Sequence, residues 1–353
     1  METAITIITS ILVFGFLIFI HEFGHYISAR IFNVKIEEFS IGMGPRLLWY
    51  DSKKTGIRYS LAMLPIGGFV SMPGENGEDE TYAHLPNTFG KKPAWQRFII
   101  TAAGAFVNIA VGFIFMIILT CLINIGDTTV REFHDTEELG LGVSSSQSGL
   151  MLGDEIIAVD GKRVRILDEL SYEIMRRGYE PINLTVIRDG KLTEIYDVQF
   201  PVQEEQGQKF GIMDFKVSRV DKSFGSVMKY SFFKGALIVR MVWESLYDLI
   251  TSRYSFAAVS GPIGISTAIG DAAAQGITSL LYITVLISIN LGVMNLLPIP
   301  ALDGGRLLTL LIEMVTRKKI PAKVEGIINA VGLVLLLGLS MIVMVKDIFQ
   351  LII

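Results

Sequence analysis

Two histidines and one glutamate lie within five consecutive residues, His21-Glu22-Phe23-Gly24-His25. Residues four apart lie on the same face of a helix, so the imidazoles of His21 and His25 can reach a single Zn²⁺ ion. Glu22 can then hold a water molecule at the metal and take its proton. Such a short pattern also arises by chance in soluble helices, so its surroundings must decide whether it is functional.

The surroundings of this motif are apolar over a length that fits a membrane. Residues 3–20 contain no Asp, Glu, Lys or Arg and lead directly into His21. Ionisable side chains within a spanning helix are costly and are usually kept for function. Their position at the end of an apolar run therefore favours a functional site over packing.

A third metal ligand is expected, because catalytic zinc takes three protein ligands and leaves one position for water. Asp303 is the candidate. It follows a long apolar run in Asn295-Leu-Leu-Pro-Ile-Pro-Ala-Leu-Asp303-Gly-Gly, where prolines and glycines should interrupt the helix. Asn290 and Asn295 could donate hydrogen bonds to a substrate or to a developing oxyanion. Hydrogen bonding between helices would explain both asparagines equally well.

The composition indicates a membrane protein. The 353 residues are 51% hydrophobic, and the mean hydropathy is +0.50, above what a soluble protein needs. Stretches free of charged residues and long enough to span a bilayer occur at 3–20, 98–126, 272–302 and 327–345. The predicted fold class is therefore a polytopic α-helical membrane protein with four transmembrane helices. The net charge of −4 gives no sign of a nucleic-acid partner, and we expect none.

The loops between the predicted spans differ in their content of lysine and arginine. None precedes the first span, whereas nine lie between the first and second spans, which places that segment in the cytoplasm. Residues 127–271 then lie outside, and the basic loop at 317–323 lies inside. The first and third spans run in the same direction, so His21 and Asp303 both arrive near the cytoplasmic side.

The long outer segment is predicted to contain a small domain at 127–203. Tight turns at Asp160-Gly161 and Asp189-Gly190 separate short β-rich runs. This inserted extracytoplasmic α/β pattern resembles a PDZ domain, which binds an extended peptide at a sheet edge; a generic α/β module without a peptide ligand is the alternative. Residues 204–271 are predicted to be a linker with an interfacial amphipathic helix at 227–250, which carries too many charges to span.

The cytoplasmic part of the first domain, residues 1–126, contains an apolar segment at 58–70 that favours β structure and is too short to cross the membrane. Extended backbone is tolerated at membrane depth only where protein or a water-filled cavity satisfies its polar groups. This segment could dip into the membrane beside the site or lie as a hairpin on the membrane surface. The last domain, residues 272–353, holds the remaining two spans and Asp303.

Taken together, these motifs resemble the site-2 proteases, specifically the bacterial RseP-like intramembrane zinc metalloproteases of peptidase family M50. The resemblance covers nearly the whole chain and rests on residues 21–25, 39–46, 64–70, 95–97, 261–265 and 295–305. Many relatives have two PDZ domains, whereas this chain has room for one. Ala105 replaces a proline and Arg306 a histidine found in many relatives, and neither is a proposed ligand.

The resemblance implies that His21, His25 and Asp303 bind one Zn²⁺ per chain and that Glu22 activates water. It also implies that the segment containing Gly67 and Gly68 pairs with substrate as an added strand, and that Asn290 and Asn295 help to position it. The expected substrate is a single-spanning membrane protein already cleaved by another protease, such as an anti-sigma factor or a signal-peptide remnant. The expected location is the bacterial cytoplasmic membrane, with the N-terminus and the PDZ-like domain outside and the active site towards the cytoplasm.

Two other classes of function would use some of these residues. A membrane zinc-binding protein or transporter could use the same ligands but needs no general base, so the role of Glu22 distinguishes it from a protease. A transporter would also tend to show inverted repeats, and none is evident. An inactive scaffold that only binds peptides would leave Glu22, both histidines and Asp303 unexplained.

Overall fold

The computed structural model describes residues 2–75, 85–135, 142–205, 208–251 and 259–352. The chain forms two compact units. The first consists of Met1–Phe115 with Ser255–Ile353, and the second of Met116–Tyr254. Each unit has its own secondary structure and core, and each is described by itself.

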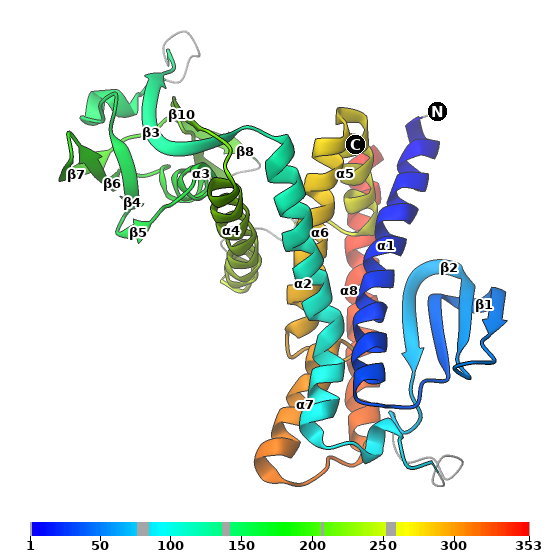
Figure 1. Cartoon of the computed structure of the whole chain (residues 1–353). Helices are drawn as coiled ribbons and strands as arrows, with labels where there is room; N and C mark the ends of the chain where they lie inside the picture. Colours follow the sequence, from blue (N-terminus) through cyan, green and yellow to red (C-terminus); the bar gives the residue numbers. More distant parts are fainter. Residues whose placement is uncertain (1, 76–84, 136–141, 206–207, 252–258, 353) are drawn as a thin grey trace. The chain divides into compact units, whose positions relative to one another are not determined.

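The first unit is mainly helical (Figure 1). Four helices in the described part of the chain are long and apolar enough to cross a membrane, at Thr3–Ile31, Ala94–Leu122, Ile277–Leu296 and Lys323–Phe349, which confirms the four predicted spans. The full helices of this unit are α1 (Glu2–Ile31), α2 (Ala94–Leu122, which continues into the second unit), α5 (Pro262–Gln275), α6 (Ile277–Leu296), α7 (Asp303–Thr316) and α8 (Ala322–Ile352).

The third predicted span, 272–302, is too long at both ends. Gly276 has a φ of 116°, a value that favours glycine, and it separates α5 from α6. At the other end α6 stops at Leu296, before Pro298 and Pro300, because proline lacks the N–H that a continuing helix needs. The apolar stretch at 272–302 therefore includes the end of α5 and the end of α6, which an apolar pattern alone does not mark.

Glycines allow α1, α2 and α6 to approach closely. A Cβ atom on Gly24 of α1 would lie 2.6 Å from the carbonyl oxygen of Ala103 in α2. One on Gly292 of α6 would lie 2.7 Å from the carbonyl oxygen of Ala105. Small residues at helix crossings are the usual way to bring backbones together in a membrane, and here they bring α1 against α2 near Ala103 and α6 against α2 near Ala105.

Beside α1 lie two long, bent strands, β1 (Glu38–Asp51) and β2 (Arg58–Ser71) (Figure 1). Residues 38–41 pair in parallel with 58–61, and the same residues of β1 pair in the opposite direction with 68–71. The bends coincide with Gly42 and Gly67, whose φ angles are 87° and 78°. Apolar side chains that are well exposed include Met43, Leu47, Leu48, Trp49, Leu61, Met63 and Leu64. Such a patch favours contact with lipid over water, whether the sheet dips into the membrane or lies on it.

The second unit contains a sheet with the strand order β10-β3-β4-β6-β7. Its elements are β3 (Ile125–Phe133), β4 (Glu155–Val159), β5 (Lys162–Arg163), α3 (Leu167–Arg177), β6 (Ile182–Arg188), β7 (Lys191–Val198), β8 (Val202–Glu205), β9 (Gln208–Gly211), β10 (Phe215–Val220) and α4 (Phe224–Ile250). The core is apolar and includes Ile156, Val159, Leu170, Ile174, Val186 and Phe215. The turns predicted at Asp160-Gly161 and Asp189-Gly190 are confirmed, since all four residues have positive φ.

The predicted linker at 204–271 differs from what the structure shows. Residues 215–220 form β10, which pairs antiparallel with β3, so the sheet extends beyond the predicted boundary at 203. Residues 262–275 form α5, which packs against α1 in the first unit. The sequence did not reveal the pairing of β10 with β3 or the packing of α5 on α1, because contacts between segments far apart in the chain leave no local sequence pattern.

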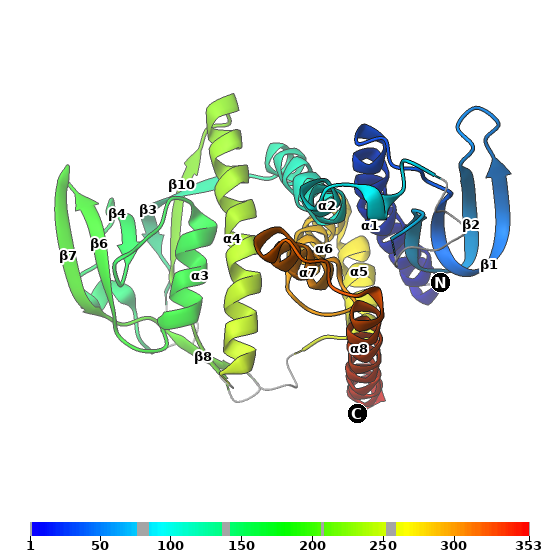
Figure 2. The same cartoon turned by 90° about the horizontal axis from the view of Figure 1, so that it is seen from below.

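The predicted helix at 227–250 is present as α4, and four of its charged residues have ion-pair partners: Lys234, Arg240, Glu244 and Asp248. α3 lies between the sheet and α4 (Figure 2), and an ion-pair network connects the two helices. Arg176 of α3 contacts Asp248 at 2.5 Å, and Arg240 of α4 contacts Glu173 at 2.7 Å. Burial and a hydrogen bond to Glu244 raise the pKa of Tyr172. The helix is amphipathic as predicted, with exposed apolar residues that include Phe224, Phe232, Trp243 and Tyr247.

A buried carboxylate on α8 holds the start of α5. Asp347 is 5% exposed, and its Oδ2 accepts hydrogen bonds from the backbone N–H groups of Gly261 (3.0 Å) and Gly264 (2.9 Å). We expect Asp347→Ala to destabilise the protein by about 1–3 kcal/mol, because it leaves buried donors without an acceptor. Thermal unfolding in detergent measures this, with the exposed Asp271→Ala on α5 as the control. Equal midpoints for the two variants would contradict the assignment.

Candidate metal centre

The side chains of His21, His25 and Asp303 converge, with one possible ligand atom from each lying within 4.8 Å of the others. The Nε2 atoms of His21 and His25 are 3.2 Å apart, and they lie 3.1 and 3.3 Å from Asp303 Oδ2. Tetrahedral zinc with bonds of about 2.0–2.1 Å separates neighbouring ligand atoms by about 3.3–3.4 Å. The three atoms therefore already have the spacing of a zinc ligand set.

Asp303 comes from the first turn of α7, just after an irregular segment. Ala301 has a φ of 71°, and a Cβ on Gly304 would lie 1.8 Å from the carbonyl oxygen of Leu297. This close folding requires a glycine directly after Asp303. The Oδ2 atom of Asp303 is buried and accepts no hydrogen bond from any residue that the structure describes. A buried carboxylate oxygen beside two imidazole nitrogens fits a bound cation.

Helix α2 supplies contacts to both histidines. His25 Nδ1 lies 2.8 Å from the carbonyl oxygen of Ile100, so Nδ1–H donates there and Nε2 stays free for a metal. One turn later a Cβ on Gly104 would lie 2.4 Å from His25 Nε2 and 2.9 Å from His21 Cε1. After another turn, Asn108 Nδ2 lies 3.3 Å from His21 Nδ1. One face of α2 thus accommodates the two imidazole rings: the Ile100 carbonyl accepts from His25, Gly104 leaves room for both rings, and the Asn108 amide contacts His21.

These contributions of α2 were missed in the sequence. Ile100 acts through its backbone, which no residue type reveals. Gly104 and Asn108 gave a weak signal, since a glycine and an asparagine four residues apart lie on one face of a helix that is mostly apolar.

Glu22 lies beside β2. A Cβ on Gly68 would be 2.9 Å from Cγ of Glu22 and 2.9 Å from the carbonyl oxygen of Ser40, so the strand passes directly next to the predicted base. Gly67 lies at the bend of the strand, against the side chain of Met43. The structure therefore brings Gly68 to the candidate site and leaves the neighbouring backbone of β2 close to it.

The asparagines of α6 are less directly connected to the site. Asn290 is exposed and Asn295 is partly buried near the end of the helix. In the described part of the chain, no hydrogen bond joins either side chain to His21, His25 or Asp303. Their contact with substrate stays a prediction.

Arg306, one turn after Asp303, joins α7 to its neighbours. Its guanidinium contacts the carboxylate of Glu75 at 2.5 Å and lies 4.9 Å from the centre of the Phe89 ring. It lines a cavity of about 360 Å³ together with Arg97 and Glu313, which form an ion pair of their own at 2.5 Å. These contacts hold the start of α7 without using a metal ligand.

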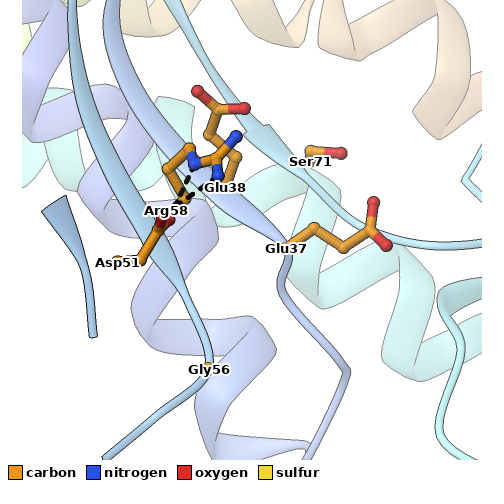
Figure 3. A pocket seen from close by; sticks show the side chains of 6 residues that line it. All are labelled: Glu37, Glu38, Asp51, Gly56, Arg58 and Ser71. Atoms are coloured by element: carbon orange, nitrogen blue, oxygen red, sulfur yellow. Dashed lines mark hydrogen bonds and ion pairs between the residues drawn. The ribbon is translucent and has the colours of Figure 1, made fainter. Parts of the chain in front are cut away.

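A second cavity, of about 320 Å³, lies on the β1–β2 sheet and is lined by Glu37, Glu38, Asp51, Gly56, Arg58 and Ser71 (Figure 3). Arg58 contacts Asp51 at 2.7 Å. The Arg46 guanidinium, 2.6 Å from Glu38, holds the pKa of that carboxyl below its usual value. Glu38 and Asp51 are thus each paired with an arginine, and none of the residues that line this cavity is a candidate ligand.

The model of peptidase family M50 matches residues 9–339. The chain belongs to peptidase family M50. A Fusobacterium nucleatum protein named "Putative zinc metalloprotease FN1322" is 32% identical over 98% of this chain and 99% of its own length. A similarly named Clostridium acetobutylicum protein is 33% identical over 97% of each chain. "Regulator of sigma-W protease RasP" of Bacillus subtilis is 25% identical over 98% of this chain and 99% of its own length.

Membership of family M50 establishes the class of activity. The protein is a zinc metalloprotease, and Zn²⁺ is its cofactor. Its four apolar helices and its similarity to RasP along nearly the full length make this M50 protease a multi-pass bacterial membrane protein.

Proposed function

We propose that this protein is an intramembrane zinc endopeptidase that cleaves single-spanning membrane proteins in or near their transmembrane segment. In this proposal His21, His25 and Asp303 hold the metal, and Glu22 is the general base. The observation that carries it is the convergence of three ligand atoms at 3.1–3.3 Å, two of them within an apolar helix long enough to span a bilayer.

Each residue has a defined part in hydrolysis. Zinc, when bound, lowers the pKa of water to about 7 and polarises the scissile carbonyl. His25 presents Nε2 because its Nδ1 is held by Ile100. Glu22 accepts the proton of the attacking water and returns it to the departing amine. Asn290 and Asn295, near the end of the same unit's α6, donate hydrogen bonds to the substrate backbone.

The β1–β2 sheet is the proposed guide for the substrate. Its exposed apolar residues suit a lipid environment, and Gly68, beside the bend at Gly67, brings β2 next to Glu22. A substrate unwound to an extended conformation can add to such a strand through backbone hydrogen bonds. This supports cleavage of a segment that leaves its helical form beside the metal.

The orientation follows from the distribution of basic residues. The N-terminus and the second unit lie outside the bacterial cytoplasmic membrane, and the metal centre lies towards the cytoplasm. The second unit, with its sheet and α3, acts as a PDZ-like module that admits or binds substrates already trimmed by another protease. Anti-sigma factors and signal-peptide remnants are the substrate classes proposed, and the name of RasP supports the former.

The experiment that tests this function measures zinc content and proteolysis together. We expect the purified wild type to hold about one zinc per chain and to cut single-spanning substrates within their apolar segment, with a chelator stopping the reaction. Asp303→Asn should lose most of its zinc and its activity, whereas the exposed Asp271→Asn should lose neither. Undiminished zinc in folded Asp303→Asn would remove Asp303 from the site.

A further inference from the structure

Asn108 lies fully buried in the middle of α2, and its side chain has one described neighbour that can share a hydrogen bond. Its Nδ2 position is 3.3 Å from His21 Nδ1, while its Oδ1 has no partner in the part of the chain that the structure describes. A buried amide without partners is costly, above all inside a membrane. The contact with His21 therefore needs an explanation beyond packing.

The tautomer of His21 decides which amide atom faces it. The Nε2 atom of His21 faces Asp303 Oδ2 at 3.1 Å, so a metal held by these residues would use the lone pair of Nε2. The remaining proton of the neutral ring is then on Nδ1, which must donate. The oxygen and nitrogen of an amide are assigned from the hydrogen-bond network rather than from shape. With the amide turned, Asn108 Oδ1 accepts from His21 Nδ1–H and gains the donor it otherwise lacks.

We propose that Asn108 is a positioning residue that fixes the tautomer and the ring plane of His21 for metal binding. The proposal rests on the proposed function, in which His21 is a ligand. The parallel contact supports it, because His25 Nδ1 is held by the Ile100 carbonyl two turns earlier on the same face of α2. Such acceptors behind metal-bound histidines orient the ring and raise its basicity.

The backbone around Asn108 is held as well. Ser288 Oγ of α6 donates to the carbonyl oxygen of Asn108 at 2.8 Å, and both residues are fully buried. This bond uses the main chain of Asn108 and leaves its side chain for His21. The hydrogen bond between α2 and α6 at this position uses the Ser288 hydroxyl and a backbone carbonyl. It does not need the side-chain amide of Asn108, so helix–helix hydrogen bonding does not explain an asparagine here.

The test compares two substitutions that differ in one property. Asn108→Leu keeps the branch at Cγ and removes the acceptor, whereas Asn108→Asp keeps an acceptor for His21 Nδ1–H. Zinc affinity is measured by competition with a chelator in detergent, and the absorption spectrum of the Co²⁺-substituted protein reports the ligand geometry. We expect Asn108→Leu to bind zinc about 10–100-fold more weakly with an altered spectrum, and Asn108→Asp to retain affinity and spectrum.

The controls distinguish a failure of the role given to Asn108 from a failure of the proposed ligand set. Thr101→Val removes a buried hydroxyl from the same helix and should leave zinc affinity unchanged. If Asn108→Leu does not fold, Asn108→Ala replaces it with the same expectation. Wild-type affinity in Asn108→Leu, or equal losses in the Leu and Asp variants, would overturn the positioning role. Retained zinc in His21→Ala would instead overturn the proposed ligand set.

Discussion

Replacing Glu22 with glutamine should leave zinc bound and slow peptide hydrolysis by about 10²–10⁴-fold, the usual contribution of a general base. Glutamine has nearly the same shape as glutamate but cannot accept the proton of water. Glu22 lies outside the set of His21, His25 and Asp303, so its replacement changes no ligand. The expected result is a protein with normal metal content that cuts its substrate at least about a hundredfold more slowly.

The measurement compares Glu22→Gln with wild type at matched zinc occupancy, using single-spanning substrates in detergent. Asp303→Asn is the contrasting variant, because it should lose zinc and hydrolysis together. Equal cleavage rates for wild type and Glu22→Gln would show that another group takes the proton. Zinc binding without hydrolysis in either protein, on substrates that another M50 protease cleaves, would instead favour a zinc-binding or transport protein.

A single methyl group at Gly104 should disrupt the metal centre. The added Cβ would lie 2.4 Å from His25 Nε2 and 2.9 Å from His21 Cε1, well inside the contact distance of about 3.5–4.0 Å between such atoms. Both rings would have to move away from their partners on α2, the Ile100 carbonyl and the Asn108 amide. Because a displacement of about 1 Å at a reacting centre can cost about 100-fold, we expect Gly104→Ala to lose at least that much activity and to bind zinc more weakly.

Two other glycines provide matched controls for this substitution. A Cβ on Gly112, also in α2, would lie 2.5 Å from the side chain of Ile289 and far from both histidines along the helix. A Cβ on Gly15 of α1 would meet nothing within 4 Å. Gly112→Ala therefore measures the effect of crowding between helices on zinc binding, and Gly15→Ala measures the effect of a glycine-to-alanine change without any new contact. Equal loss of zinc in Gly104→Ala and Gly112→Ala would assign the effect to helix packing.

The sequence predicted the parts of this protein that depend on residue type and short spacing. The four spans follow from length and apolarity, and the convergence of His21, His25 and Asp303 follows from helix periodicity, the orientation of the spans and the coordination of zinc. The contributions of Ile100 and Gly104 could not be predicted in the same way. One acts through a carbonyl oxygen and the other through the absence of a side chain, so neither carries a chemical group that identifies it.

The boundaries of elements were harder to predict than their presence. Residues 272–302 have one continuous apolar pattern, yet Gly276 and the prolines after Leu296 divide it between two helices and an irregular segment. Residues 204–226 have no strong pattern, and the pairing of β10 with β3 joins segments about ninety residues apart in the chain. Tertiary pairing of this kind overrides what local propensity indicates.

The network between α3 and α4 determines where the second unit can be cut for separate study. Glu173 is fully buried, and its Oε1 lies 2.7 Å from Arg240; Asp248 is 1% exposed and is paired with Arg176. A fragment ending at residue 203 would lack β10 and α4, and it would leave Glu173 and Arg176 of α3 without their partners. Breaking a buried ion pair in this way is strongly destabilising. Peptide-binding work on the isolated domain therefore calls for a fragment that begins before β3 and continues through the end of α4.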